Sequence, residues 1–214
     1  MTSEALDALT HTIDTSAPLK RGEALYRAGD RADAWYIVRS GVMKTLTVTP
    51  DGEEHVTGFH YAGEIIGLEG TATGGHEESA VALEAATACA LTLESLPELW
   101  ALGAGPAILS LIGERDRTLS LLRINMSQSR AEMRIAGYLK LLMDRTARQG
   151  YDPTCLAMPM SRTDLANHLG LTLECVSRVL SKWRKAGVLE TGRNSMQIRQ
   201  PDELATAAYH LAAA

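Results

Sequence analysis

Residues 161–180, SRTDLANHLGLTLECVSRVL, decide the fold because they have the pattern of a helix-turn-helix. Two short runs of apolar residues recur at helical spacing: Leu165, Ala166 and Leu169, then Val176, Val179 and Leu180. Gly170 separates the runs and suits the positive φ of a sharp turn, because glycine has no Cβ. A plain αα-hairpin shares parts of this pattern. The small residue, the turn glycine and both apolar faces together favour a unit whose second helix enters the DNA major groove.

Two polar residues mark where the helices begin. Ser161 followed by Asp164 predicts a capping box at the first helix, with Asp in place of Glu or Gln. Thr172 suits the N-cap of the second helix. Helix N-termini also contact phosphates in DNA complexes, so Ser161 and Thr172 are candidate contacts to the DNA backbone.

The outward face of the second helix carries the residues that we expect to read bases. Glu174, Ser177 and Arg178 stand at i, i+3 and i+4, near the helix N-terminus. Arg donates two hydrogen bonds to guanine, Glu accepts from cytosine N4, and Ser adapts to either. The alternative is a surface pair of Glu174 and Arg178 with no role in recognition. Lys182, on the following turn, suits a phosphate contact that positions the unit without specifying sequence.

The run Glu174-Cys-Val-Ser177-Arg178 resembles the E-x-x-S-R signature of the CRP/FNR family of bacterial transcription regulators. It resembles the FNR and FixK branches more than the cyclic-AMP receptor branch, which has Arg where this chain has Leu173 and Gly at the position of Ser177. The resemblance extends from about Pro18 to Leu211. It implies a homodimer on double-stranded DNA, at an inverted repeat similar to TTGAT-N4-ATCAA.

Composition limits the remaining classes. The 214 residues allow one large domain or two small ones, and no apolar run approaches the ~20 residues of a membrane helix. The first residues, MTSEALDALT, do not have the pattern of a signal peptide. Cys89, Cys155 and Cys175 are odd in number and far apart, which is typical of a reducing compartment. We therefore expect a cytoplasmic protein that does not enter a membrane.

The net charge of −5 is unevenly distributed. Residues 161–199 contain seven Lys or Arg and three Asp or Glu, so they carry +4 and the rest of the chain carries −9. This asymmetry predicts a basic DNA-reading region on an acidic body.

Residues 18–93 predict short antiparallel strands, because turn residues recur at regular intervals. Asp51-Gly52 is the strongest of these signals and predicts a hairpin between 43–48 and 54–60. The region is similar to the β-roll effector domain of the family. The resemblance also implies a contact with RNA polymerase, which we place around Val56 to Gly58.

A long helix is predicted from Pro106 to about Ser127. Its seam residues follow a spacing of four and three and are the candidate dimer contacts: Ile108, Ile112, Arg115, Leu119, Leu122 and Met126. The alternative is that this stripe packs on the β-roll. We favour the dimer, because reading an inverted repeat requires two copies of the recognition helix.

The C-terminal part completes an α+β fold. Ser129 and Glu132 predict a capping box and a hinge near 127–130, followed by a helix over 131–148. After the recognition helix, 188–198 predicts a wing hairpin whose tip residue, Arg193, is a candidate phosphate contact. The expected order is an effector β-roll domain over 1–104, a dimerisation helix over 105–128 and a winged helix-turn-helix DNA-binding domain over 129–214.

The resemblance also raises cofactors, and two of them are not expected. The cyclic-AMP binders pair a G-E with an R-[ST]-A whose Arg holds the cyclic phosphate. This chain keeps Gly63-Glu64 but has Glu78-Ser79-Ala80, where the carboxylate repels a phosphate. An FNR-type iron–sulfur cluster needs four ligands. Cys89 falls where the fourth would lie, but the N-terminal segment has no cysteine. A strand over 80–93 makes Cys89 a small strand residue.

Two sensor hypotheses remain open beside activity without an effector. Heme is one, with His11, His60 or His76 as axial ligand, although the six histidines show no ligand spacing. The other is redox control through Cys175, which lies beside Glu174 near a helix N-terminus, an environment that favours thiolate. A small packing residue is the competing interpretation of Cys175. An enzyme built on the β-roll would need a metal-ligand or nucleophile–base set on the strands, and the sequence shows none. The family resemblance suggests genes of anaerobic or microoxic respiration, denitrification or nitrogen fixation.

Overall fold

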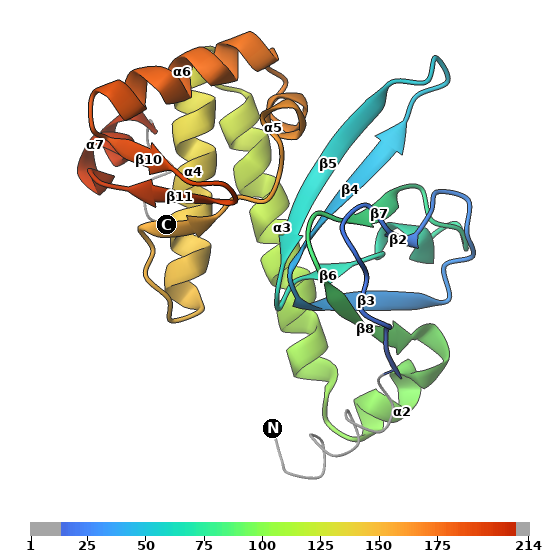
Figure 1. The fold of residues 1–214 in the computed structure, drawn as a ribbon. Coiled ribbons are helices and arrows are strands. Elements are labelled where there is room, and N and C mark those ends of the chain that lie inside the picture. The colour runs from blue at the N-terminus through green and yellow to red at the C-terminus, as the bar shows by residue number, and fades with distance from the viewer. Residues whose placement is uncertain (1–13, 209–214) are drawn as a thin grey trace. The chain divides into compact units, whose positions relative to one another are not determined.

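The computed structural model describes residues 14–208, and its contacts divide the chain into two compact units. One unit ends at Arg117 and the other begins at Thr118. Figure 1 labels the helices and strands that belong to the two units. The boundary therefore falls inside helix α3 (Gly105–Met126), whereas the sequence predicted boundaries at 104/105 and 128/129. Among the described residues, no helix is long and apolar enough to cross a membrane.

The first unit is the predicted antiparallel β-roll. One four-stranded sheet has the order β1-β8-β3-β6 and the other has the order β2-β7-β4-β5. The strands are β1 (Asp14–Thr15), β2 (Ala24–Tyr26), β3 (Ala34–Ser40), β4 (Val42–Val48), β5 (Glu54–Tyr61), β6 (Ile65–Ile66), β7 (Ser79–Ala82) and β8 (Thr87–Thr92). Two 3₁₀ turns, η1 (Glu69–Thr71) and η2 (Leu93–Ser95), and helix α2 (Leu96–Ala101) complete it. Cys89 lies in β8 and is half-buried.

The predicted hairpin is present as β4 and β5, with Gly52 at a φ of 88° in the turn. The pairing shifts register between Thr45 and Leu46, which leaves Thr57 of β5 outside the ladder. Val56 and Gly58 on either side of Thr57 are buried. Of the segment assigned to RNA polymerase, Thr57 is thus the residue that is partly accessible, and the contact itself stays a prediction.

The N-terminal half of α3 packs on the β-roll. Ile108 is 3% exposed and forms a cluster with Leu91, Leu99 and Ala104. Arg115 Nη1 donates to the carbonyl oxygen of Ile65 over 3.3 Å. These two members of the predicted dimer seam are therefore committed to their own chain, as the alternative interpretation of the stripe expected. Helical spacing does not say which of two surfaces a residue meets, so the part of Ile108 and Arg115 in a dimer stays a prediction.

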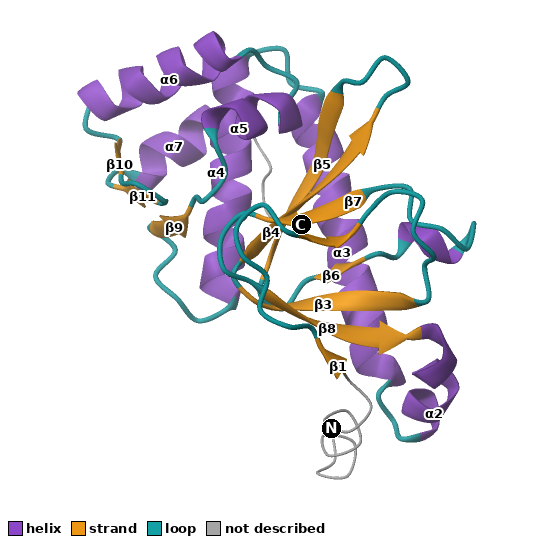
Figure 2. Cartoon of the chain, turned by 45° about the vertical axis from the view of Figure 1, so that its right-hand side comes forward, coloured by secondary structure: helices purple, strands orange, loops and turns teal. Residues whose placement is uncertain are grey.

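The second unit is a winged helix-turn-helix. Its helices are α4 (Ala131–Arg148), α5 (Arg162–His168), α6 (Leu173–Lys185) and α7 (Pro201–Ala207). Its sheet has the order β10-β11-β9, with β9 (Cys155–Ala157), β10 (Leu189–Thr191) and β11 (Ser195–Ile198). Figure 2 shows these three short strands beside the helices. The core residue Leu139 of α4 and the inner faces of α5 and α6 are buried.

The predicted capping box at Ser129 and Glu132 is absent. Helix α4 has Arg130 as its N-cap, with no hydrogen bond from the cap side chain. The Glu132 carboxylate instead accepts from Lys182 Nζ over 2.7 Å. The local pattern predicted that Glu132 accepts a hydrogen bond from a backbone amide. In the structure it accepts from Lys182, fifty positions away in the chain.

Candidate nucleic-acid interface

The turn between α5 and α6 has the local structure that the sequence predicts. Ser161 Oγ accepts from the Asp164 amide over 2.9 Å, and Asp164 Oδ2 accepts from the Ser161 amide over 3.2 Å, which is the reciprocal capping box. Gly170 has a φ of 61°. Thr172 caps α6, since its hydroxyl accepts from the Cys175 amide over 3.2 Å. The Ser161 capping box therefore fixes where α5 begins, and the Thr172 cap fixes where α6 begins.

Helix α6 has one buried and one exposed face. The buried face consists of Val176, Val179, Leu180 and Trp183. Glu174 and Arg178 are exposed and Ser177 is half-buried, on the first half of the helix. The structure therefore brings the three predicted base-reading residues together on one accessible surface. Trp183 was missed by the sequence analysis, although it continues the inner face at i+3 from Leu180.

Two contacts on this face link recognition candidates to other side chains. Arg178 Nη2 lies 3.7 Å from Cys175 Sγ and donates to it. Lys182 pairs with Glu132, and the two side chains are 64% and 43% exposed. An ion pair this exposed contributes little to stability, so Lys182 remains available for a phosphate.

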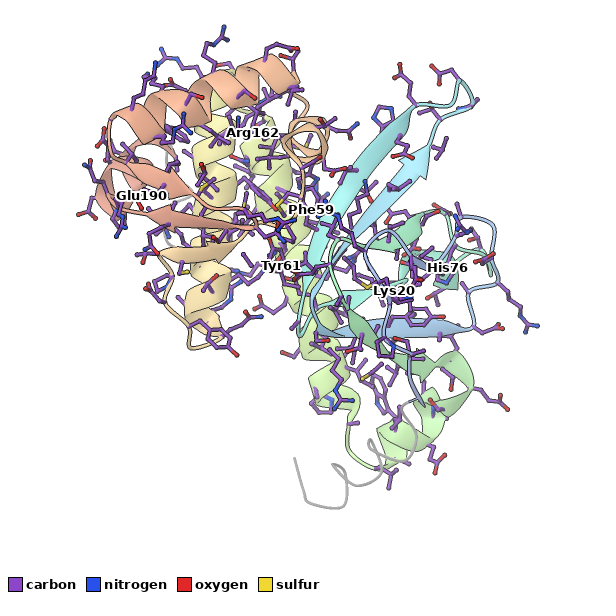
Figure 3. All side chains as sticks on the ribbon, in the orientation of Figure 1. Lys20, Phe59, Tyr61, His76, Arg162 and Glu190 are labelled. Atoms are coloured by element: carbon purple, nitrogen blue, oxygen red, sulfur yellow. The ribbon has the colours of Figure 1, made fainter. Side chains whose placement is uncertain are left out.

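The wing lies beside the helices and presents one basic residue at its tip. Its turn closes with a 2.8 Å hydrogen bond from the Gly192 amide to the Ser195 carbonyl, and Arg193 is exposed there, as predicted. At the other end of the hairpin, Arg199 Nη2 donates to Glu190 of β10 (labelled in Figure 3) over 2.9 Å. This hydrogen bond holds the pKa of the Glu190 carboxyl below its usual range. Arg193 is thus the wing's candidate for a phosphate contact.

The sequence analysis missed Arg134. This residue of α4 donates from Nη1 to the carbonyl oxygens of Leu169 and Gly170, over 3.2 and 3.3 Å, and from Nε to that of Gln128, over 2.7 Å. All three acceptors are backbone atoms, so no side-chain pattern could have revealed them. Arg134 therefore stabilises the turn of the helix-turn-helix by hydrogen bonds from α4.

The first unit contains a cluster of buried and partly buried polar residues around Tyr26 and His76. Tyr26 stacks on His76 at 3.7 Å between ring centroids, and His76 Nδ1 lies 3.2 Å from Glu69 Oε1. Burial raises the pKa of the nearby Glu78 carboxyl, and the charge of Glu69 raises it further. Two neighbouring carboxylates make this region unfavourable for a phosphate.

Two of the three alternative heme ligands, His60 and His76, lie in the described β-roll, and both are buried. His60 is buried and its Nε2 lies 2.9 Å from Thr45 Oγ1, while the His76 side chain (labelled in Figure 3) is enclosed by Tyr26 and Glu69. His11 lies outside the described residues. Within residues 14–208, no three His, Cys, Asp or Glu side chains group so as to hold a metal ion.

Comparisons with known proteins agree with this architecture. Residues 133–207 match the Crp-like helix-turn-helix domain, and residues 17–101 match the cyclic nucleotide-binding domain. The Fumarate and nitrate reduction regulatory protein of Salmonella typhimurium is 34% identical over an alignment 214 positions long, which spans 96% of this chain and 83% of that protein.

Solved structures show the same fold. FixK2 from Bradyrhizobium japonicum superposes with a TM-score of 0.78 at 25% identity, over 94% of this chain and 99% of that one. A CRP family transcriptional regulator from Thermus thermophilus gives a TM-score of 0.71 at 20% identity, over 90% of this chain and 96% of its own. The helix-turn-helix, the β-roll and the 34% identity to the fumarate and nitrate reduction regulator lead to one conclusion. The chain belongs to the CRP/FNR family of DNA-binding transcription regulators and is not an enzyme.

Proposed function

We propose that this regulator binds as a homodimer to an inverted repeat similar to TTGAT-N4-ATCAA and controls respiratory or microoxic, denitrification or nitrogen-fixation genes. The observation that carries the proposal is the exposed face of α6, where Glu174, Ser177 and Arg178 lie together. Their chemistry matches a G·C pair, with Arg178 on guanine and Glu174 on cytosine. The name of the relative from Salmonella typhimurium, a fumarate and nitrate reduction regulator, supports the choice of genes.

The dimer in this proposal uses the exposed side of α3. Leu109 and Leu119 are 56% and 38% exposed, and Met126 is exposed on the same helix. Ile112 and Leu122 are half-buried beside them. Large apolar side chains along one helix gain from contact with a second copy, and two copies supply the two recognition helices that an inverted repeat requires.

We propose further that no cyclic nucleotide is needed. Glu78 is partly buried near Glu69, and its raised pKa reflects an environment that already disfavours one negative charge. A cyclic phosphate would add another. The alternative, an effector-gated sensor, is supported by one specific contact, that between Cys175 and Arg178 on the DNA-facing helix. RNA polymerase is the partner that a transcription activator of this design would contact.

The test is binding of the purified, air-exposed protein to the TTGAT repeat at stated salt. The control duplex has the guanine of each half-site exchanged for cytosine and the paired cytosine for guanine. We expect binding without additives, no change on addition of cyclic AMP, and weaker binding to the control by at least about tenfold. Equal affinity for both duplexes would contradict the assigned sequence. Binding that appears only after heme, nitric oxide or reductant is added would replace the effector-free function with the sensor.

A further inference from the structure

Asn125 attaches the last turn of α3 to the DNA-binding helices. It is a polar residue only 1% exposed, and its Nδ2 donates to the carbonyl oxygen of Arg134 in α4 over 2.8 Å. Residues of α3 from Thr118 onward belong to the same compact unit as α4, α5 and α6. The end of the long helix is therefore part of the DNA-binding unit and not a free connection.

Arg134 extends the attachment to the recognition elements. Its Nε holds the Gln128 carbonyl, in the segment that joins α3 to α4. Its Nη1 holds the carbonyls of Leu169 and Gly170, which end α5 and form the turn before α6. The backbone carbonyl of Arg134 thus accepts a hydrogen bond from α3. Its side chain donates to the turn that precedes α6.

The segment 127–130, predicted to be a hinge, is consequently braced. Gln128 is held from two sides, because its amide donates to the Asn125 carbonyl over 3.2 Å and its carbonyl accepts from Arg134. A four-residue connection without these hydrogen bonds would allow α6 to move relative to the end of α3. With the braces, the last turn of α3 and the helix-turn-helix are held together within the second unit.

We propose that Asn125 and Arg134 determine the spacing between half-sites that this regulator accepts. The inference rests on the proposed function in requiring two copies joined along α3. Each added base pair moves the second half-site by about 3.4 Å and turns it by about a tenth of a helical turn. Two rigidly attached recognition units tolerate such a shift poorly, whereas two loosely attached units follow it.

The experiment compares spacers of three to six base pairs. Wild type is first used to select its operator from random duplexes, so that the test does not depend on TTGAT. Affinity is then measured for the selected half-sites at each spacing, for wild type, Asn125→Ala, Arg134→Met and Arg134→Lys. Arg130→Met, which removes an exposed arginine side chain from the same connection, is the matched control.

We expect wild type and Arg130→Met to prefer one spacer by more than about tenfold. The preference should fall below about threefold in Asn125→Ala and Arg134→Met, while the discrimination against a mutated half-site and the dimer mass stay unchanged. Arg134→Lys keeps the charge and some of the donors, so it should retain part of the preference.

Two results would overturn the inference, and they are distinguishable. A uniform loss of affinity at all spacings, with the wild-type preference kept, would make the pair ordinary structural residues. A wild-type protein that selects a single half-site as a monomer would remove the dimer of the proposed function, and the inference with it. Selection of a different repeat by wild type would correct the operator alone and leave the spacing test intact.

Discussion

Arg178 and Cys175 are in contact on the exposed side of α6: the Arg178 guanidinium donates to the Cys175 thiol over 3.7 Å. The residue expected to read guanine therefore lies against the candidate redox residue. A thiol is a weak acceptor and leaves the guanidinium free to turn toward a base. Oxidation by peroxide to sulfinic acid replaces it with an anion, which would hold Arg178 in a charge-assisted pair.

The first prediction is that peroxide treatment lowers both the affinity for the operator and the preference for guanine over the other bases. Removal of the Arg178 side chain should have the same two effects. Cys175→Ser should keep both after the same treatment. Cys155→Ser is the matched control, since Cys155 is exposed on β9 away from the recognition residues, and it should remain sensitive. Titration of duplex binding before and after peroxide measures the effect. Equal loss in wild type and Cys175→Ser would show that the thiol is a packing residue.

The second prediction concerns Arg178 itself. Arg178→Ala should cost about 1–3 kcal/mol of binding free energy on the selected operator and should relax the preference at the guanine position. The reason is that a bidentate Arg–guanine contact discriminates against the other bases. Binding to a panel of duplexes with each base at that position gives the measurement. A loss that is the same for all four bases would assign Arg178 to the DNA backbone.

The third prediction follows from the pair of Lys182 and Glu132. Lys182→Ala should weaken binding to all sequences alike and lower the slope of log affinity against log salt by about 1. Glu132→Gln releases Lys182 from its partner and should strengthen non-specific binding slightly. Salt titrations with operator and non-operator duplexes test both variants. A change in base preference in Lys182→Ala would contradict a backbone role.

The sequence predicted the local structure of the site well and its long-range contacts poorly. The capping box at Ser161, the turn at Gly170 and the wing tip at Arg193 depend on neighbouring residues, and the structure has all three. The partners of Glu132 and Arg134 are far away in the chain, so short patterns did not contain them. Ile108 shows another limit of prediction from sequence. An apolar stripe has the same spacing whether it packs on a β-roll or on a second helix.

The fourth prediction concerns pH and Glu78. Burial raises the pKa of this carboxyl and Glu69 adds to the effect, while Arg115 and hydrogen bonds from Thr57 and Thr45 oppose it. A raised pKa means that the folded state binds the proton more tightly than the unfolded state. The contribution to stability is therefore complete below the unfolded pKa and is lost as pH rises through the folded value.

Glu78→Gln removes this dependence, because the amide stays neutral at every pH. We expect its urea midpoint to exceed that of wild type at neutral pH and the difference to disappear in acid. Glu77→Gln, an exposed neighbour, serves as the control and should follow wild type. Urea unfolding of the three proteins between acid and neutral pH gives the comparison. A difference that persists unchanged in acid would mean that packing of the amide, and not the charge, is responsible.

The fifth prediction separates the two sides of α3. Ile108 is buried against Leu91 and Leu99, so Ile108→Ala should cost about 2–5 kcal/mol of stability and leave the dimer intact.

Leu119 is exposed on the same helix, so Leu119→Glu should leave the folding of the monomer largely unchanged. It would place a charge in the proposed contact between copies and should yield monomers. Because operator binding requires two recognition helices, Leu119→Glu should also lose affinity for the repeat while keeping weak binding to one half-site. Sedimentation and thermal unfolding of both variants provide the test. Dimer loss in Ile108→Ala without loss of stability, together with a dimeric Leu119→Glu, would place the interface on the Ile108 side of α3.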